Sequence, residues 1–177
     1  MSKICSNDCI FVVETYRILI MNIILIVVGK TDEEWLSKGI EEYKTRIERF
    51  IRFDIQVIPD LKKTRNINTE AQKTLEGERI LKLIRPSDEI ILLDEKGAGM
   101  SSSDMASWLE KRLTQSAKRL VFIIGGPYGF SPEMYERASE KLSLSRMTFS
   151  HQMVRLIFTE QLYRAFSIIN NLPYHHD

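Results

Sequence analysis

Cysteine is scarce in this chain of 177 residues, because Cys5 and Cys9 are its two cysteines and both lie close to the N-terminus. Two cysteines four residues apart, without a second pair, make neither a disulfide framework nor a zinc site. A chain that otherwise has no thiol is compatible with a reducing compartment. We therefore expect a cytoplasmic protein whose fold does not depend on disulfides.

Residues that bind metals are also few. The chain has three histidines, His151, His175 and His176, and no cysteine or carboxylate is clustered with them at ligand spacing. A G-x-S-x-G nucleophile motif is absent as well. We expect no metal, and this pattern gives no sign of a serine hydrolase.

An excess of one charge sign and a long apolar run are both missing. The formal net charge is +1, so no overall field attracts the chain to nucleic acid, and an RNA site would have to be a local patch or a match of shape. The longest apolar run, from Ile18 to Val28, is interrupted by Asn22 and is shorter than the about 20 residues that span a bilayer. We therefore expect no membrane contact.

The first 20 residues do not have the charge pattern and cleavage site of a secretory signal. Met21 begins MNIILIVVGK, which is typical of the start of a first strand. We expect residues 1–20 to be an N-terminal extension, either disordered or from an upstream start codon. Residues 21–177 then form a single domain, since a chain that is 44% hydrophobic can bury one sizeable core.

Two nucleotide-binding motifs are absent, the P-loop G-x-x-x-x-G-K-[ST] and the dinucleotide fingerprint G-x-G-x-x-G. The glycines from Gly125 to Gly129 (GGPYG) have a different spacing, and Pro127 lacks the N–H group that a phosphate cradle would use. A strand followed by such glycines fits a tight structural turn as well as a ligand site.

Strands and helices alternate along the chain. Apolar or alternating runs predict strands at residues 23–28, 53–58, 90–93 and 120–124. Helical spacing of apolar residues predicts the helices between them, and the expected start signals are a Thr31–Glu34 capping box, Ser102 or Ser103, and Ser131-Pro132-Glu133. Residues 70–84 and 153–170 also have a helical pattern, whereas residues 95–103 (EKGAGMSSS) are typical of a turn.

Two C-terminal patterns are unusual. In residues 142–149 the apolar alternation shifts by one position, which predicts a bend near Ser145 and Arg146. The last helix has an apolar stripe, yet Leu156 and Tyr163 lie on its opposite face. A helix with two apolar faces needs two packing partners, and the second can be another subunit.

The order of elements predicts an α/β fold with a mainly parallel sheet and helices on both faces. Ligands of such sheets bind beyond the carboxyl ends of the strands. Three segments should reach that edge: Leu93 to Gly99, Gly125 to Gly129, and Leu144 to Phe149. We expect a cofactor there.

Four long motifs then resemble one known family. IIGGPYGFSP (123–132), LSLSRMTFSHQMVR (142–155), EQLYRAFSIINNLPYHHD (160–177) and LLDEKG (92–97) are similar to the SPOUT-class methyltransferases that modify large-subunit rRNA. More narrowly, they resemble the branch that methylates N3 of a pseudouridine in 23S rRNA. The resemblance extends from Met21 to Asp177. It implies a C-terminal trefoil knot, an exception to the rule that chains are not knotted, and a homodimer.

The resemblance also implies S-adenosylmethionine as cofactor and no metal. Carried onto this chain, the implied cofactor contacts are Leu93, Gly125, Leu144, Ser145, Arg146, Met147, Thr148 and Phe149. Many relatives have proline before the histidine of the knot, where this chain has Ser150, so we expect a slightly looser backbone there.

Methylation at N3 of a pseudouridine requires loss of a proton, so a base or a cation that stabilises the anion is needed. The candidate catalytic residues are His151, Arg155, Tyr174 and His175.

Each of these residues also has a structural interpretation. His151 can bond backbone in the knot, and Arg155 can form a structural ion pair. The Tyr174–His175 tail can fray, or can cover the active site of its own or the partner subunit, where Tyr174 would stack on a base.

Charged side chains elsewhere are ambiguous in the same way. Glu160 and Arg164 can pair on the helix surface, four residues apart. Lys62, Lys63 and Arg65 can contact phosphates or remain solvated.

Two other classes of function remain. A dinucleotide-binding oxidoreductase is disfavoured by the missing fingerprint, and a non-catalytic ribosome-binding factor by the cofactor-loop sequence. Because the chain is nearly neutral and has no separate RNA-binding domain, we expect assembled ribosomes rather than isolated RNA as substrate.

Overall fold

The computed structural model describes residues 21–61, 67–114 and 119–175, and the sheet at its centre is entirely parallel. The strands lie in the order β2-β1-β4-β3-β5. This confirms the predicted α/β class with a parallel sheet. In chain order the elements are β1 Asn22–Val28, α2 Glu34–Ile47, β2 Arg52–Ile58, α3 Thr69–Leu81, β3 Glu89–Gly99, α4 Ser102–Thr114, β4 Arg119–Ile124, α5 Pro132–Arg137, β5 Glu140–Ser143 and α6 Met153–Ile169.

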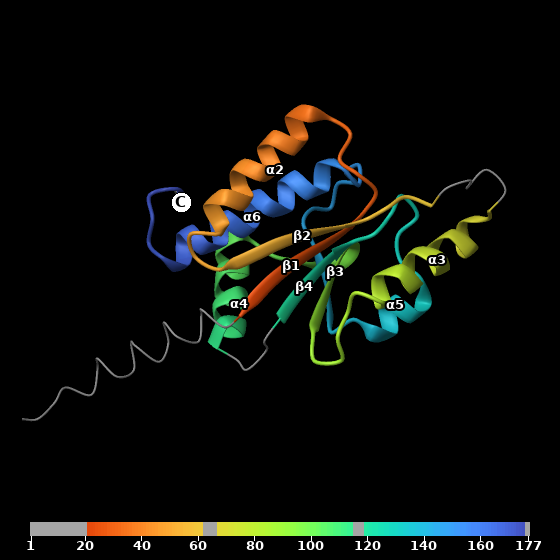
Figure 1. The fold of residues 1–177 in the computed structure, drawn as a ribbon. Helices are drawn as coiled ribbons and strands as arrows, with labels where there is room; N and C mark the ends of the chain where they lie inside the picture. The colour runs from red at the N-terminus through yellow and green to blue at the C-terminus, as the bar shows by residue number, and fades with distance from the viewer. Residues whose placement is uncertain (1–20, 62–66, 115–118, 176–177) are drawn as a thin grey trace, which may run out of the picture.

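The apolar strands are buried because helices cover both faces of the sheet (Figure 1). Helices α2, α4 and α6 pack on one face, and α3 and α5 on the other. β1 lies inside the sheet and pairs with β2 and β4, so that Leu25 lies between Ile55 and Phe122. Such strands are continuous apolar runs because both of their sides face the core.

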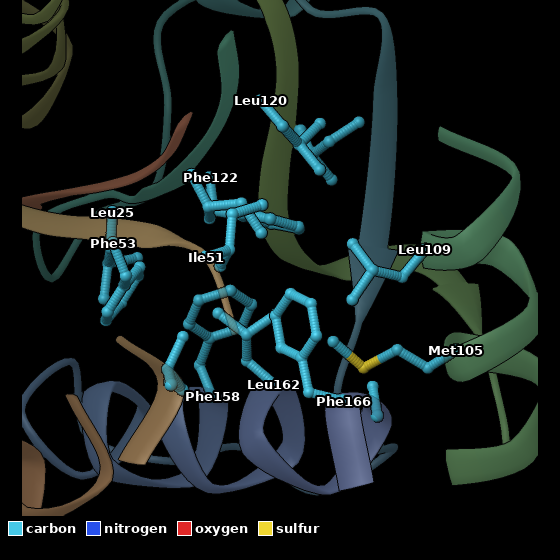
Figure 2. Close-up of a cluster of buried hydrophobic side chains, with 14 of the residues drawn as sticks. Leu25, Ile51, Phe53, Met105, Leu109, Leu120, Phe122, Phe158, Leu162 and Phe166 are labelled. Atoms are coloured by element: carbon cyan, nitrogen blue, oxygen red, sulfur yellow. The ribbon is translucent and has the colours of Figure 1, made fainter. Parts of the chain in front are cut away.

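The larger core cluster lies between the sheet and α4 and α6 (Figure 2). Phe122 of β4 contacts Phe158 of α6, with ring centroids 4.7 Å apart and planes tilted by 49°. Both side chains are fully buried, as is Leu162 one turn further along α6. The apolar stripe of the last helix therefore fixes α6 to the sheet, and the N-terminus of α6 lies beside the carboxyl ends of the strands.

Two predicted helix starts were wrong. Helix α2 begins at Glu34 with Glu33 as N-cap, and the Thr31 hydroxyl accepts a hydrogen bond from Arg155 instead of capping the helix. Helix α4 is capped by Ser101 rather than by Ser102 or Ser103. The Ser101 hydroxyl accepts from the Asp104 N–H at 3.1 Å, while the Asp104 carboxylate accepts from the Ser101 N–H at 3.3 Å. That reciprocal pair is a capping box with aspartate at its fourth position.

Strand β3 is longer than predicted, since it continues through the expected turn to Gly99. Leu93 and Ala98 both pair with Leu142 of β5, so the intervening residues form a bulge. A side chain at Gly97 would place its Cβ 2.6 Å from the backbone nitrogen of Leu142. The turn-like composition therefore reflects a close approach of two strands, where glycine is required for space.

The bend predicted near Ser145 and Arg146 is confirmed. β5 ends at Ser143, whose hydroxyl donates to the Ser145 carbonyl at 2.8 Å. The Ser145 hydroxyl then accepts from the Met147 N–H at 2.9 Å. These local bonds turn the chain across the end of the sheet. The expected N-terminal extension at residues 1–20 lies outside the described residues, and the trefoil knot stays a prediction.

Candidate active site

A pocket of about 420 Å³ lies at the carboxyl ends of β3, β4 and β5. The three segments that the sequence places at this edge do meet there. The pocket is lined by Leu93, Asp94, Glu95, Lys96, Ile124, Gly125, Gly126, Pro127, Tyr128, Gly129, Phe130, Tyr135, Ser143, Leu144, Ser145, Met147, Thr148, Phe149, His151 and Val154.

Seven of the eight expected cofactor residues line this pocket: Leu93, Gly125, Leu144, Ser145, Met147, Thr148 and Phe149. The eighth, Arg146, lines a neighbouring hollow together with Glu95 and Gly97. Ser145 and Leu144 border both spaces, so the bend divides them. All eight residues are therefore close together, and their contact with a cofactor stays a prediction.

The glycine turn after β4 forms one wall of the pocket. Gly129 has a φ of +82°, a conformation that other residues rarely adopt, and its N–H donates to the Gly126 carbonyl at 3.1 Å. A Cβ at Gly125 would come within 3.1 Å of the Gly129 carbonyl oxygen. The sequence left this segment open between a structural turn and a ligand site, and the structure makes it a tight turn whose backbone faces the pocket.

An acidic rim is the part of the site that the sequence did not single out. Asp94 and Glu95 follow the buried part of β3, and the Tyr135 hydroxyl of α5 donates to the Asp94 carboxylate at 2.5 Å. Burial, with this hydrogen bond second, raises the pKa of Tyr135 to about 12, so the hydroxyl keeps its proton. The strand-edge argument covered Asp94 and Glu95 as part of a segment, whereas no local signal pointed to Tyr135.

His151 lies at the pocket wall just before α6 and is half-buried. Burial lowers the pKa of His151 below its ordinary value, and the positive charge of Arg155 lowers it further. The imidazole is therefore neutral at neutral pH, and a neutral imidazole has a nitrogen that can accept a proton. Ser150 bonds the first turn of α6, because its hydroxyl accepts from the Met153 N–H at 3.2 Å.

Arg155 is buried, with 2% of its side chain exposed, and it lies behind the pocket rather than on its wall. Its guanidinium donates to the Val28 carbonyl at 2.6 Å, to the Thr31 hydroxyl at 2.9 Å and to the His151 carbonyl at 3.1 Å. Among the described residues no carboxylate forms a salt bridge with it, although burial lowers the pKa of Arg155 and the charges of Asp60 and Asp32 raise it. The predicted ion pair is therefore present only as a longer-range attraction. The geometry favours a positioning role that ties β1 to the start of α6.

The C-terminal tail folds back on α2 and α6 of its own chain. The Tyr174 hydroxyl is 3.1 Å from that of Tyr43 and 3.2 Å from a Glu160 carboxylate oxygen, and its ring packs edge-on against Tyr163. Burial raises the pKa of Tyr174. His175 Nδ1 lies 3.4 Å from the Arg164 guanidinium.

Within the described part of this one chain, Tyr174 and His175 do not line the pocket. Glu160 is six residues beyond Val154, which corresponds to about 9 Å along the helix. The tail is thus ordered against α6 but does not cover the pocket of its own chain. Glu160 and Arg164 form the predicted pair, at 2.6 Å.

The sequence also raised questions about a basic loop, a metal site and membrane contact. Lys62, Lys63 and Arg65 lie outside the described residues. Among the residues that are described, no three histidine, cysteine or acidic side chains gather as a metal-ion group. In the same part of the chain, none of the helices combines the length and apolar character needed to cross a membrane.

Known proteins place this architecture in a family. The family described as "Predicted SPOUT methyltransferase" matches residues 21–175. The chain is 54% identical over 157 residues to the "Ribosomal RNA large subunit methyltransferase H" of Parabacteroides distasonis, covering 89% of this chain and all of that protein. A protein of the same name from Phocaeicola vulgatus is 55% identical over the same shares.

A solved structure supports the fold. The crystal structure of a probable methyltransferase from Bordetella pertussis Tohama I superimposes with a TM-score of 0.52 at 11% identity, over 86% of this chain and 98% of that one. A likeness at this identity concerns the fold alone. The match over nearly all described residues, together with relatives more than half identical over their whole length, shows that this chain belongs to the SPOUT methyltransferase family.

Proposed function

We propose that this chain transfers a methyl group from S-adenosylmethionine to N3 of a pseudouridine in 23S rRNA, as a cytoplasmic homodimer acting on assembled ribosomes. The observation that carries the proposal is the meeting of three chain segments around a pocket of about 420 Å³, with a neutral histidine at its wall. Family membership supports methyl transfer, and the names of the relatives support rRNA of the large subunit as substrate. The knot and the N3 position rest on the sequence resemblance.

The residues of the pocket fit S-adenosylmethionine. The volume is within the range of about 300–1,000 Å³ that is usual for small-molecule sites. Leu93, Leu144 and Phe149 offer apolar contact, and Gly125 lets a ligand approach the backbone. Asp94 and Glu95 offer negative charge, which favours a ligand that carries a sulfonium and an ammonium group. When bound, this cofactor supplies an electrophilic methyl group.

The residues of the chain then prepare the nucleophile. N3 of pseudouridine carries a proton and reacts poorly until that proton leaves, so a base is needed. A nitrogen of His151 is our candidate for accepting it, because the depressed pKa keeps the imidazole neutral. Leu93, Leu144 and Phe149 would reduce the contact of the pseudouridine anion with water, and the pocket would hold its N3 in line with the methyl group. Arg155 holds His151 in place through the His151 carbonyl.

A homodimer would bring Tyr174 and His175 to the site. The tail does not cover its own pocket, so we propose that it contributes to the pocket of the partner subunit. Support comes from Trp35, which is 55% exposed on α2. The second apolar face of α6, expected to need another subunit, is covered within the chain, because Leu156 lies against Gly39 of α2 and Tyr163 packs on Tyr43 and Tyr174. Sedimentation equilibrium should give twice the 20.7 kDa of one chain. Mixed dimers of H151N and H175A subunits should regain part of the activity that either variant lacks alone.

The decisive experiment is transfer of a radiolabelled methyl group from S-adenosylmethionine to ribosomes from a strain that lacks this gene, followed by mapping of the label. Label at N3 of one large-subunit pseudouridine is the expected result. Naked rRNA and a hairpin carrying the same pseudouridine are the matched substrates, and efficient methylation of the hairpin would refute the requirement for ribosomes.

Two outcomes would favour a different function for this chain. Binding of S-adenosylmethionine without transfer to any ribosomal RNA would favour a non-catalytic ribosome-binding factor. Binding of a nicotinamide dinucleotide in its place would favour an oxidoreductase. A titration with both cofactors therefore precedes the transfer assay.

A further inference from the structure

Helix α3 packs against the glycine turn on the side that faces away from the pocket. A Cβ placed on Gly126 would come within 2.4 Å of Glu76 Oε2 and 3.0 Å of its carboxyl carbon. The next residue of the helix, Gly77, faces Ser131, whose hydroxyl would lie 2.7 Å from a Cβ at that position. Two consecutive residues of α3 thus contact the two ends of the segment 126–131, most of which lines the pocket.

Glu76 is an unusual residue for the contact between α3 and the glycine turn. Its side chain is 4% exposed, and among the described residues its Oε2 has no hydrogen-bond partner. Oε1 accepts from the Gln72 amide at 2.8 Å, one turn earlier on the same helix, which fixes the direction of the side chain. A buried polar atom without a partner costs free energy, so apolar packing alone gives no reason for a carboxyl group here.

The carboxyl group is too far behind the wall to react. Gly126 lines the pocket, and Glu76 lies on the other side of Gly126. Burial raises the pKa of Glu76, although the hydrogen bond from Gln72 lowers it, and the nearby charges of Asp60 and Arg79 act in opposite directions. A carboxyl group whose direction is fixed by Gln72 can act as a rigid support for a backbone that has no side chain of its own.

We propose that Glu76 is a positioning residue, and that its carboxyl group holds Gly126 at the depth where the turn 125–130 shapes the pocket for its ligand. Gly126 must then be glycine because of Glu76, and the two positions must change together. This inference rests on the proposed function only in taking S-adenosylmethionine as the ligand.

A double-mutant cycle with G126A and E76A tests the contact. The added methyl group of G126A collides with Glu76 Oε2 and pushes the turn into the pocket, so the Kd for S-adenosylmethionine should rise about tenfold. E76A removes the support and should raise the Kd by a smaller factor. In the double variant the methyl group occupies the space that the carboxyl group leaves, and the Kd should return to within about threefold of the wild-type value.

Two further variants separate shape from charge and from helix damage. E76Q keeps the length of the side chain and should bind like the wild type, whereas E76Q/G126A keeps the collision and should bind as poorly as G126A. Glu78 is exposed on the same helix, so E78Q should change nothing. Calorimetry gives the Kd, and thermal unfolding of each variant reports whether it folds and whether the double variant recovers stability.

Additive losses in the double variant, or normal binding by G126A, would overturn the proposal. The unfolding temperatures test the same contact without any ligand. If the wild-type protein does not bind S-adenosylmethionine, the proposed function fails, while recovery of unfolding temperature in E76A/G126A would still show that Glu76 supports Gly126. If the wild type binds and no recovery occurs in either measurement, the positioning role alone is refuted.

Discussion

Replacement of Arg155 by methionine tests how much a buried guanidinium contributes to this fold. The side chain is 2% exposed, and its three hydrogen bonds join the start of α6 to the end of β1 and the loop that follows β1. Methionine fills a similar length but donates no hydrogen bond. In R155M the Val28 carbonyl, the His151 carbonyl and the Thr31 hydroxyl all lose this donor.

The magnitude follows from the number of bonds and from the cost of burying the cation. A hydrogen bond to a charged group contributes about 1.5–3 kcal/mol. The three contributions do not simply add, and methionine also removes the free-energy cost of keeping a cation out of water. We therefore expect R155M to lower the free energy of unfolding by about 2–4 kcal/mol.

Urea unfolding at one fixed protein concentration measures this loss. With a slope of about 2 kcal/mol/M, the midpoint should fall by about 1–2 M urea. R155K keeps the charge but offers a smaller donor set, so its midpoint should lie between those of R155M and the wild type. Arg49 is exposed on the turn after α2, and R49M is the matched control with an expected change within about 0.5 kcal/mol.

One result would refute the reasoning and another would add to it. If R155M is as stable as R49M, the buried bonds contribute nothing net and the positioning role is wrong. If R155K keeps near-normal stability but loses methyl transfer, the three bonds of the guanidinium position His151 for the reaction, in addition to stabilising the fold.

Three other substitutions, the first with a matched control, have expected outcomes. G97A should destabilise by about 1–3 kcal/mol because its methyl group meets the β5 backbone, whereas G99A, with no atom within 4 Å of the added Cβ, should stay within about 0.5 kcal/mol in the same urea assay. H151N should lower kcat by about 10²–10⁴ if the imidazole is the base, as measured by initial rates on ribosomes. The lowered pKa of His151 means that the unfolded chain binds its proton first as pH falls, so this contribution to stability is present at neutral pH and is lost in mild acid. H151N should therefore flatten the fall of unfolding free energy between about pH 7 and 5, and an unchanged slope would contradict the burial argument. Y174F should lower the free energy of unfolding by at most about 1 kcal/mol, as measured by thermal unfolding, because the ring contact with Tyr163 remains when the hydroxyl bonds are lost. A larger decrease would mean that hydrogen bonds hold the tail.

The sequence alone predicted the class of the fold and the edge of the sheet that carries the pocket. Apolar runs such as residues 23–28 and 120–124 are strands because the spacing of apolar residues acts over a few neighbours, and the alternation of such runs with helices favours a parallel sheet. Parallel strands share one carboxyl edge, so the segments after 93, 124 and 143 had to meet.

Contacts between residues far apart in the chain were decided by the tertiary structure alone. Thr31 resembles a helix cap in the sequence, yet it bonds Arg155, which lies 124 residues further on. Gly97 resembles a turn residue, yet it lies in a strand because Leu142 of β5 approaches it. Tyr135 on Asp94 and Glu76 behind Gly126 have no local signal at all. Local propensity favours an element, but which side chain meets which backbone depends on how the completed elements pack, and packing is a property of the whole chain.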